Sequence, residues 1–381
     1  MERRTNVFAK GIEMGVGTIH SRDLDQFVSE CDRRGGIAHP DAVKYVEDFD
    51  LRFETAVDKT LDPFSDAYFS QQQALYSELA GRKLDQSTGE LSPLDPTAHT
   101  SGCNPYNSRD VGFISKHART IHTCLLMADL PAGAKILDAG SGWGLSSEMM
   151  AFAGAEVTAV DINPPFVELV RRRSERLGLP ITSVHATFDE FETDQQFDLL
   201  FFYECLHHSL KPWETVARLG RFVKSGGKIT IAGEPINAIW WPHWGIRLDA
   251  LSVYCIRKFG WWESGWTEEF IVRCFERAGF TLTLYPHVGL ANGHVGVGVR
   301  EPVKLELSIL EPFRQIAAAA PPAEVVATAP PPPAPTWDES ALRAENAALR
   351  HALADMQSSR SWRVTAPMRY LFQKFGVSRA A

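Results

Sequence analysis

The stretch Lys135-Ile-Leu-Asp-Ala-Gly-Ser-Gly-Trp-Gly144 decides the fold, because it joins a short apolar run to a glycine-rich turn. The run is typical of a buried β-strand, and the pattern from Trp143 onward predicts a helix. Glycines let the backbone approach a ligand closely, and the N-terminus of a helix offers free N–H groups and a positive dipole to an anionic group. We therefore expect a ligand-binding turn between a first strand and a helix.

A second apolar run, residues 156–160, ends next to Asp161. A carboxylate at the end of the strand that follows the turn can accept hydrogen bonds from both hydroxyls of a ribose. The turn and the carboxylate together predict a cofactor that contains a nucleoside. In the dinucleotide pattern G-x-G-x-x-G/A counted from Gly140, the third small residue falls on Leu145, so NAD fits poorly.

Beyond the turn, short apolar runs alternate with helical patterns, which is the signature of a parallel sheet covered by helices on both faces. We predict strands over residues 135–139, 156–160, 181–186, 197–203 and 228–232, and helices over 165–177, 212–223 and 267–278. Two further strand-like runs, 281–285 and 293–299, are joined by a loop too short for a crossover helix, so they predict an antiparallel hairpin. The fold class is therefore α/β: a doubly wound, Rossmann-like, mostly parallel seven-stranded sheet that ends in a hairpin.

The turn resembles the first motif of the class I S-adenosylmethionine-dependent methyltransferase family, which is an acidic residue followed by three glycines at alternate positions. The resemblance spans residues 134–300 and extends to the terminal hairpin. It implies S-adenosyl-L-methionine as the cofactor. The residues that it implies for cofactor binding are Asp138, Gly140, Ser141, Gly142, Gly144, Asp161, Ile162, Phe188, Asp189 and Glu204.

The resemblance also implies which part of the cofactor these residues hold. Residues 140–142 would line the methionine end, Asp161 would bind the ribose and Ile162 would pack on the adenine. Many members of the family carry an acidic residue that contacts the adenine amine at the position of Thr187, so we expect Asp189 to act as its substitute.

The fourth strand runs into Tyr203-Glu-Cys-Leu-His-His208, which resembles the family's fourth motif, whose C-terminal end faces the methyl group. Ligands of open parallel sheets bind beyond the carboxyl ends of the strands, so His207 and His208 are placed for function. Methyl transfer to oxygen or nitrogen removes a proton, and histidine has the pKa of a general base near neutrality. One hypothesis makes either histidine the catalytic base. The other has a histidine cap the next helix or form a hydrogen bond in the core.

Two segments are candidates for the acceptor site. Residues 236–266 contain six tryptophans, whose faces pack on sugar rings or lipid tails, so this segment predicts a substrate lid that contacts the acceptor through Trp240, Trp241 and Trp244. The alternative is a hydrophobic subdomain clamped onto the sheet. Tyr106 and Arg109, near the end of the polar loop 82–109, would close over the cofactor carboxylate or belong to a plain loop.

Composition separates four zones. Residues 1–130 predict an N-terminal helical cap with a loop, and 131–316 form the methyltransferase domain. Residues 317–337 are an Ala/Pro-rich linker. Residues 338–381 predict a short coiled coil and a basic amphipathic tail. The heptad positions are Leu342, Asn346, Leu349, Leu353 and Met356.

This C-terminal region suggests partners. The heptads over 342–356 would pair two copies of the chain as a homodimer or pair the chain with a similar tail. The segment Ser361-Trp-Arg-Val-Thr-Ala-Pro367 resembles tails of bacterial glycosyltransferases and methyltransferases of cell-surface polysaccharide assembly. That resemblance implies contact with the membrane or with a glycan-assembly enzyme. A generic basic amphipathic tail is the other interpretation.

Charge and cysteine usage exclude several classes. Lys and Arg total 39 against 47 Asp and Glu, a net charge of -8, which disfavours nucleic acid as a partner. The six cysteines form no C-x-x-C pair, so we expect buried thiols, no metal site and a cytoplasmic location. The apolar stretch 235–246 is shorter than the ~20 residues of a membrane span, so the membrane contact would be peripheral, at the inner face.

The resulting hypothesis is an enzyme that methylates a sugar hydroxyl on a cell-surface polysaccharide or its precursor, with most of the rate coming from holding the two reactants in line. The second hypothesis is a small-molecule or natural-product acceptor. The third is an inactive scaffold that kept the cofactor fold and acts through its coiled coil, although the intact glycine turn and Asp161 argue against it.

Overall fold

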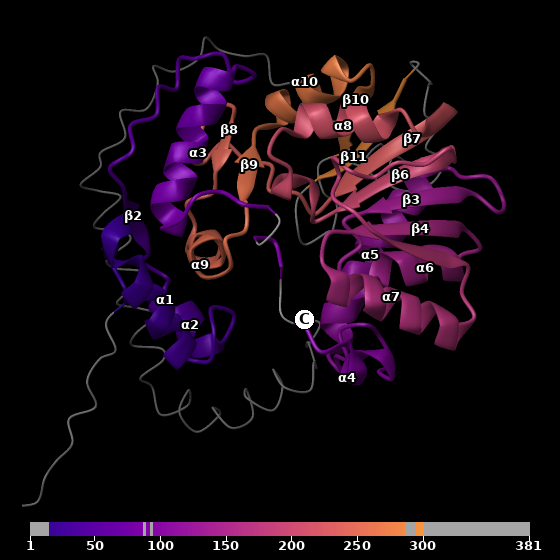
Figure 1. Cartoon of the computed structure of the whole chain (residues 1–381), viewed down its shortest axis with the longest axis horizontal. Coiled ribbons are helices and arrows are strands. Elements are labelled where there is room, and N and C mark those ends of the chain that lie inside the picture. The colour runs from indigo at the N-terminus through magenta and orange to yellow at the C-terminus, as the bar shows by residue number, and fades with distance from the viewer. Residues whose placement is uncertain (1–14, 87–88, 92–93, 286–293, 301–381) are drawn as a thin grey trace, which may run out of the picture. The chain divides into compact units, whose positions relative to one another are not determined.

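The computed structural model describes residues 15–86, 89–91, 94–285 and 294–300 (Figure 1). The predicted linker, coiled coil and basic tail lie outside these residues. Within the described part of the chain, no helix is both long and apolar enough to cross a membrane.

A seven-stranded sheet organises the described part of the chain from Lys135 onward (Figure 1). Its order is β10-β11-β7-β6-β3-β4-β5, and β11 alone among these strands runs antiparallel to its neighbours. The predicted sheet and its terminal hairpin are therefore confirmed. The strands are β3 (Lys135–Ala139), β4 (Glu156–Asp161), β5 (Ile181–His185), β6 (Phe197–Tyr203), β7 (Val223–Ala232), β10 (Thr281–Tyr285) and β11 (Val295–Val299).

Helices cover both faces of this sheet because alternate residues of each strand point to opposite sides. On β3, Ile136 packs in the core shared with α5 and α6, whereas Leu137 packs in the core shared with α8 and α10. Helix α7 packs against β4 and β5. The helices are α5 (Val111–Ala128), α6 (Leu145–Phe152), α7 (Pro164–Leu177), α8 (Pro212–Gly220) and α10 (Glu268–Arg277).

The boundary between helix α8 and strand β7 differs from the sequence prediction. Helix α8 ends at Gly220 and β7 begins at Val223, five residues earlier than the apolar pattern at Lys228 indicates. The register of β6 and β7 shifts between Phe197 and Leu199, and Gly226 within β7 has a φ of 77°. An irregular strand of this kind breaks the alternation on which the prediction relied.

The N-terminal helices and the tryptophan-rich segment form a common layer, although they are far apart in the sequence. Helix α3 packs on α9 and β8, and α1 packs on α9. The buried Tyr68 hydroxyl donates to the Trp244 carbonyl at 2.6 Å, and the Trp244 indole N–H donates to the Pro63 carbonyl at 2.7 Å. The elements are α1 (Leu24–Arg33), α3 (Asp66–Ala80), β8 (Trp244–Ile246), α9 (Ala250–Phe259) and β9 (Ser264–Trp266).

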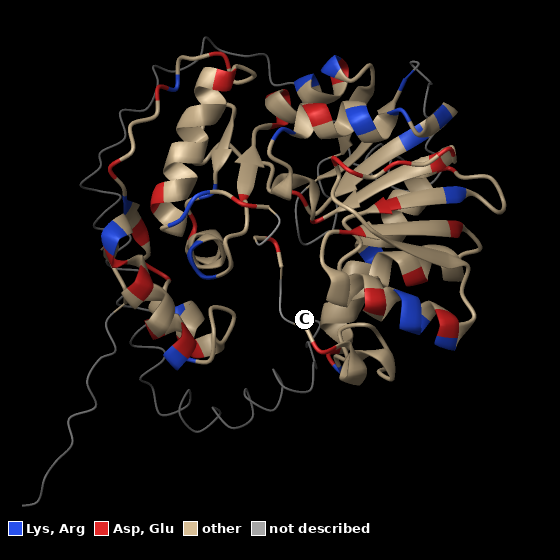
Figure 2. Ribbon diagram, viewed as in Figure 1, with Lys and Arg blue, Asp and Glu red and all other residues tan. Residues whose placement is uncertain are grey.

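Several short elements were not predicted, because three to six residues carry too little periodicity to be recognised. Two of them, β1 and β2, pair in parallel as a small sheet, and η2 follows β6. Figure 2 shows Lys and Arg interspersed with Asp and Glu over the described helices. The short elements are β1 (Thr18–His20), η1 (Ser21–Asp23), α2 (Pro40–Tyr45), β2 (Asp50–Arg52), α4 (Pro96–Thr100) and η2 (Leu206–His208).

Candidate functional site

A cavity of about 540 Å³ lies where β3, β4 and β6 end, which is the usual ligand position in an open parallel sheet. A cavity of this size can enclose a cofactor-sized molecule. Its lining contains both main-chain and side-chain groups from segments far apart in the sequence. The lining residues that bear on function are Gln86, Glu90, Tyr106, Phe113, His117, Gly140, Gly142, Trp143, Asp161, Ile162, Phe166, Thr187, Phe188, Asp189, Glu204, His208 and Trp261.

The glycine turn presents its backbone to this cavity. Gly140 has a φ of 72°, and a Cβ added there would lie 2.7 Å from the Cys205 Cβ, so a side chain is excluded both by conformation and by space. Gly144 caps α6 with a φ of 82°, and its Cβ would meet Val170 at 2.6 Å. Close packing of the turn against β6 and α7 therefore leaves only its main chain beside the ligand.

Three of the residues implied for cofactor binding do not line the cavity: Asp138, Ser141 and Gly144. Asp138 is buried and accepts hydrogen bonds from the hydroxyls of Ser146 and Ser147 at 2.7 and 2.5 Å. Burial raises the pKa of Asp138 to about 6. Its carboxyl group thus anchors the first turn of α6 and acts on a ligand only through the position of that helix.

Asp161 is held in a fixed orientation at the end of β4. Its Oδ2 accepts from the Gly142 N–H at 2.7 Å, and its Oδ1 accepts from the Asn163 N–H at 2.8 Å. The residue is 8% exposed, and burial raises its pKa. Each carboxylate oxygen has two lone pairs, so both oxygens keep an acceptor site after these contacts. The carboxylate that the sequence indicated as a ribose ligand therefore contacts the glycine turn through a direct hydrogen bond.

The cavity wall beside Asp161 contains both apolar and polar residues. Ile162 and Phe188 line the cavity, together with Thr187 and Asp189 from the loop after β5. The sequence placed Ile162, Phe188 and Asp189 here. It did not identify Phe166 and Trp143, whose rings contact each other at 5.2 Å between centroids. Trp143 lies between two glycines of the turn, and this position could have indicated that it lines the cavity.

Glu204 lines the cavity directly after β6, beside a cluster of aromatic side chains. Its φ of 52° is uncommon for a residue with a side chain. The His117 Nδ1 lies 2.6 Å from the Tyr203 hydroxyl, and the Tyr106 ring stacks on His117 at 5.6 Å. Burial lowers the pKa of His117 and outweighs the nearby Glu204 carboxylate, which acts to raise it. Tyr106 thus belongs to the site, whereas Arg109 is exposed and does not line the cavity.

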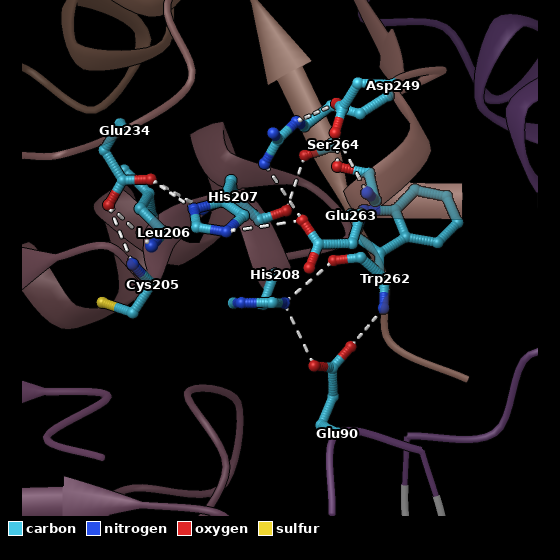
Figure 3. A network of polar contacts seen from close by, with 12 residues as sticks. Glu90, Cys205, Leu206, His207, His208, Glu234, Asp249, Trp262, Glu263 and Ser264 are labelled. Carbon is cyan, nitrogen blue, oxygen red and sulfur yellow. Dashed lines mark hydrogen bonds and ion pairs between the residues drawn. The ribbon is translucent and has the colours of Figure 1, made fainter. Parts of the chain in front are cut away.

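The histidine pair divides between the cavity wall and the layer behind it (Figure 3). His208 lines the cavity, and its Nδ1 lies 3.1 Å from the Glu90 Oε2 and 3.0 Å from the Trp262 carbonyl oxygen. Burial disfavours charge on His208, but the Glu90 carboxylate outweighs it and raises the pKa of the ring to about 9. Of the two histidines, His208 alone lines the cavity.

His207 is buried and faces carboxylates on two sides (Figure 3). Its Nδ1 lies 2.8 Å from the Glu234 Oε2, and its Nε2 lies 3.7 Å from the Glu263 Oε2. Glu234 also accepts backbone N–H groups of Cys205, Leu206 and His207. Burial opposes ionisation of Glu234, but His207 and these N–H groups outweigh it and lower its pKa.

The tryptophans expected to contact the acceptor lie in the core or at its edge, and none of the three lines the cavity. Trp241 and Trp244 are 5% and 1% exposed, and the Trp241 indole N–H donates to the Ile246 carbonyl at 2.7 Å. Trp240 is half-buried and packs against the same core. Large indole rings gain most by burial, and Trp244 contacts aromatic rings of α3, α8 and α10. From this segment Trp261 lines the cavity.

Comparison with known proteins assigns the segment that carries these features. Residues 137–231 match the family model described as a methyltransferase domain. This segment is therefore similar in sequence to methyltransferase domains. It contains the glycine turn, Asp161, the residues after β5 and the histidine pair, and it supports the S-adenosylmethionine cofactor implied by the resemblance.

Curated relatives match over a similar region. The chain is 36% identical over 104 residues to a ubiquinone biosynthesis O-methyltransferase of Proteus mirabilis, covering 27% of this chain and 42% of the relative. It is 31% identical over 156 residues to the protein of the same name from Aromatoleum aromaticum, covering 40% of this chain and 58% of the relative. The chain thus spans about half the length of the curated relatives that it matches.

Among solved structures, the 1,6-didemethyltoxoflavin-N1-methyltransferase of Burkholderia thailandensis, bound to 1,6-didemethyltoxoflavin and S-adenosylhomocysteine, is 22% identical. The similarity covers 53% of this chain and 82% of that protein, with a TM-score of 0.39. We draw no functional argument from a structural similarity of this strength, and the similarity to methyltransferase domains is based on the sequence of residues 137–231.

Proposed function

We propose that this protein is an enzyme that transfers the methyl group of S-adenosylmethionine to an oxygen atom of a second molecule bound in the same cavity. The observation that carries the proposal is the hydrogen bond between Asp161 and Gly142 in the cavity wall. It joins the carboxylate that a ribose needs to the backbone turn that lets a ligand approach closely. The methyltransferase-domain match covers both residues.

The charges of the cavity wall suit this cofactor. Four carboxylates line the cavity, and none of the described lining residues is Lys or Arg. S-adenosylmethionine carries a positive sulfonium, a positive ammonium group and one carboxylate, so that its net charge is positive, whereas a dinucleotide carries a negative pyrophosphate. An acidic wall attracts the first and repels the second. The carboxylates are Glu90, Asp161, Asp189 and Glu204.

The chain's own residues would hold each part of the cofactor. Asp161 would accept the ribose hydroxyls with the lone pairs that its backbone contacts leave free. Ile162 and Phe188 offer apolar surface to the adenine, and Glu204 offers a carboxylate to the ammonium group. When bound, S-adenosylmethionine supplies an activated methyl group. The cavity then contributes by excluding water and by holding the acceptor in line with the methyl group.

The remaining lining residues suggest the acceptor. Gln86, Glu90 and His208 supply polar groups beside the indole of Trp261. An aromatic face flanked by hydrogen-bonding groups suits a sugar ring, so a sugar hydroxyl of a cell-surface polysaccharide or its precursor remains our first candidate. The names of the curated relatives, which refer to ubiquinone biosynthesis, favour a small-molecule acceptor as the second candidate.

The two candidates can be separated by following the methyl group. The full chain would be incubated with methyl-labelled S-adenosylmethionine and, in separate reactions, with a small-molecule extract and a surface-glycan fraction from cells that lack the protein. Label is expected in the glycan fraction, and less label is expected with Asp161→Ala, the control with weakened cofactor binding. Label in the small-molecule fraction alone would establish the second candidate. Absence of label from both fractions, with cofactor bound, would favour an inactive scaffold.

A further inference from the structure

We propose that His207, His208 and Glu263 form a binding site for one divalent transition-metal ion of the zinc class beside the cavity, whose wall His208 lines. One ligand atom from each residue lies within 4.8 Å of the others, and Figure 3 shows the three side chains next to one another. His207 and Glu263 are buried, and His208 is half-buried. The two segments are far apart in the sequence, so no spacing motif reveals the site.

The surroundings of His207 are those of a metal ligand. Its Nδ1 lies 2.8 Å from the Glu234 carboxylate, which three backbone N–H groups hold in place. A carboxylate can only accept, so Nδ1 carries the proton of the neutral ring and Nε2 presents a lone pair. A carboxylate on the far side of a metal-ligating histidine is a common device that fixes the tautomer and raises the basicity of the ligand nitrogen.

The distance between His207 and Glu263 fits two ligands of one ion. The Nε2 and Oε2 atoms are 3.7 Å apart, which is too far for a hydrogen bond. Two ligands at zinc distances are roughly 3.4 Å apart in a tetrahedral site and roughly 4.2 Å apart when they lie on opposite sides of the ion. The observed separation falls between these values. The ligand atom of His208 lies within 4.8 Å of both.

Oxygen atoms around His208 also favour a cation at this site. Its Nδ1 has two close partners, the Glu90 Oε2 and the Trp262 carbonyl oxygen, and both can only accept. A proton or a metal ion can satisfy that arrangement. With an ion in place, either oxygen could become an additional ligand. The mixture of imidazole nitrogen and carboxylate oxygen is the donor set that zinc and similar ions prefer.

The buried charges also call for a cation. The side chains of Glu90, Glu234 and Glu263 are 9%, 0% and 7% exposed, and the partner that ion-pairs with Glu263 from outside the histidine pair is Arg247. When a metal ion takes the place of the proton on His208 and both imidazoles are neutral, three carboxylates and one guanidinium leave two negative charges, the charge that one divalent ion neutralises. The more exposed Asp249 also pairs with Arg247 and adds to the negative side. Buried charges are normally paired or coordinated to a metal.

The test uses the full chain without a polyhistidine tag, stripped with a chelator and titrated with Zn²⁺ by calorimetry. Co²⁺ added to the stripped protein provides an optical readout of coordination geometry. We expect one equivalent of Zn²⁺ per chain, and Co²⁺ absorption bands of a four- or five-coordinate site. Both readouts are independent of methyl transfer, so failure of the proposed function would leave them unchanged.

Variants assign the site. His207→Gln and Glu263→Gln should each lower Zn²⁺ affinity by at least about tenfold, and Glu234→Gln should lower it by about 10- to 100-fold without removing a ligand. His122→Gln on α5 and Glu214→Gln on α8 serve as matched controls and should bind as the parent does. Unchanged affinity in the three site variants would overturn the proposal. So would a parent protein without stoichiometric Zn²⁺ and without Co²⁺ bands, which decides the matter even if a variant fails to fold.

Discussion

The Asp161 carboxylate and the Gly142 backbone N–H are joined by a hydrogen bond of 2.7 Å, which links the end of β4 to the turn after β3. Their sequence separation spans a complete helix and strand, so the contact exists only in the folded sheet. It places the carboxylate beside the turn at the cavity wall. Loss of either partner should therefore affect cofactor binding more than it affects the fold.

Removing the carboxylate tests the first half of this relationship. Asp161→Ala should lower the affinity for S-adenosylmethionine by 1 to 3 kcal/mol, about 5- to 150-fold, because the ribose hydroxyls lose their acceptor inside a buried site. Calorimetric titration of both proteins measures the difference. Asp194→Ala, at an exposed position before β6, is the matched control. Equal loss in the control, or no loss in Asp161→Ala, would contradict the assigned role.

Two glycines of the turn should respond differently to alanine. At Gly140 the added Cβ would lie 2.7 Å from the Cys205 Cβ at a φ of 72°, so Gly140→Ala should cost stability and lower the midpoint of thermal unfolding by several degrees. At Gly142 the Cβ meets no described atom within 4 Å and lies in the cavity wall. Gly142→Ala should then weaken cofactor binding at a smaller cost in stability. Equal unfolding midpoints for both variants would show that the turn is not packed as described.

Asp138 should make the fold less stable as the pH rises. Burial raises its folded-state pKa to about 6, above the usual value of 3.8, so the unfolded chain releases this proton first and stability falls between about pH 4 and pH 6. The contribution is roughly 3 kcal/mol over that window. Urea unfolding should be measured for the parent and for Asp138→Asn at several pH values. As the pH rises through this window, the unfolding free energy of Asp138→Asn should increase relative to that of the parent by this amount. A constant difference between the two proteins across the window would count against the raised pKa.

The union of the N-terminal helices with the tryptophan-rich segment also has a measurable consequence. Tyr68→Phe removes the donor to the buried Trp244 carbonyl, and leaving that oxygen unpaired should cost about 1 to 3 kcal/mol of unfolding free energy. Urea denaturation provides the value. Tyr45→Phe, at a partly exposed ring under Arg34, is the control and should change stability by less. Similar losses in both variants would indicate that the Tyr68 hydroxyl does not join the two segments.

The sheet was predictable because its signals are local. Each strand is a short apolar run, and the turn between β3 and α6 carries glycines whose conformations few other residues adopt. The loop between β10 and β11 is too short for a helix, which by itself forces the hairpin. The same reasoning located Asp161, since the carboxyl ends of neighbouring parallel strands meet at one edge of the sheet.

The parts that sequence could not supply depend on contacts between distant segments. Glu90, Glu234 and Glu263 come from three loops or strand ends, and only the folded chain brings them around the histidine pair. The same holds for the tryptophans: composition marked residues 236–266 as unusual, but burial of Trp244 against Pro63 and Tyr68 depends on the N-terminal helices. The sequence could have indicated His117 as a site residue, because it lies one helical turn after Phe113 on α5 and both line the cavity.

The most direct measurement is a calorimetric titration of the full chain with S-adenosylmethionine, run beside an identical titration with NAD. One S-adenosylmethionine should bind per chain, NAD should bind far more weakly, and Asp161→Ala should reduce the heat of the first titration to a weak signal. Equal or tighter binding of NAD, or S-adenosylmethionine binding that is the same in Asp161→Ala as in the parent, would show that the cavity is not a methyl-donor site.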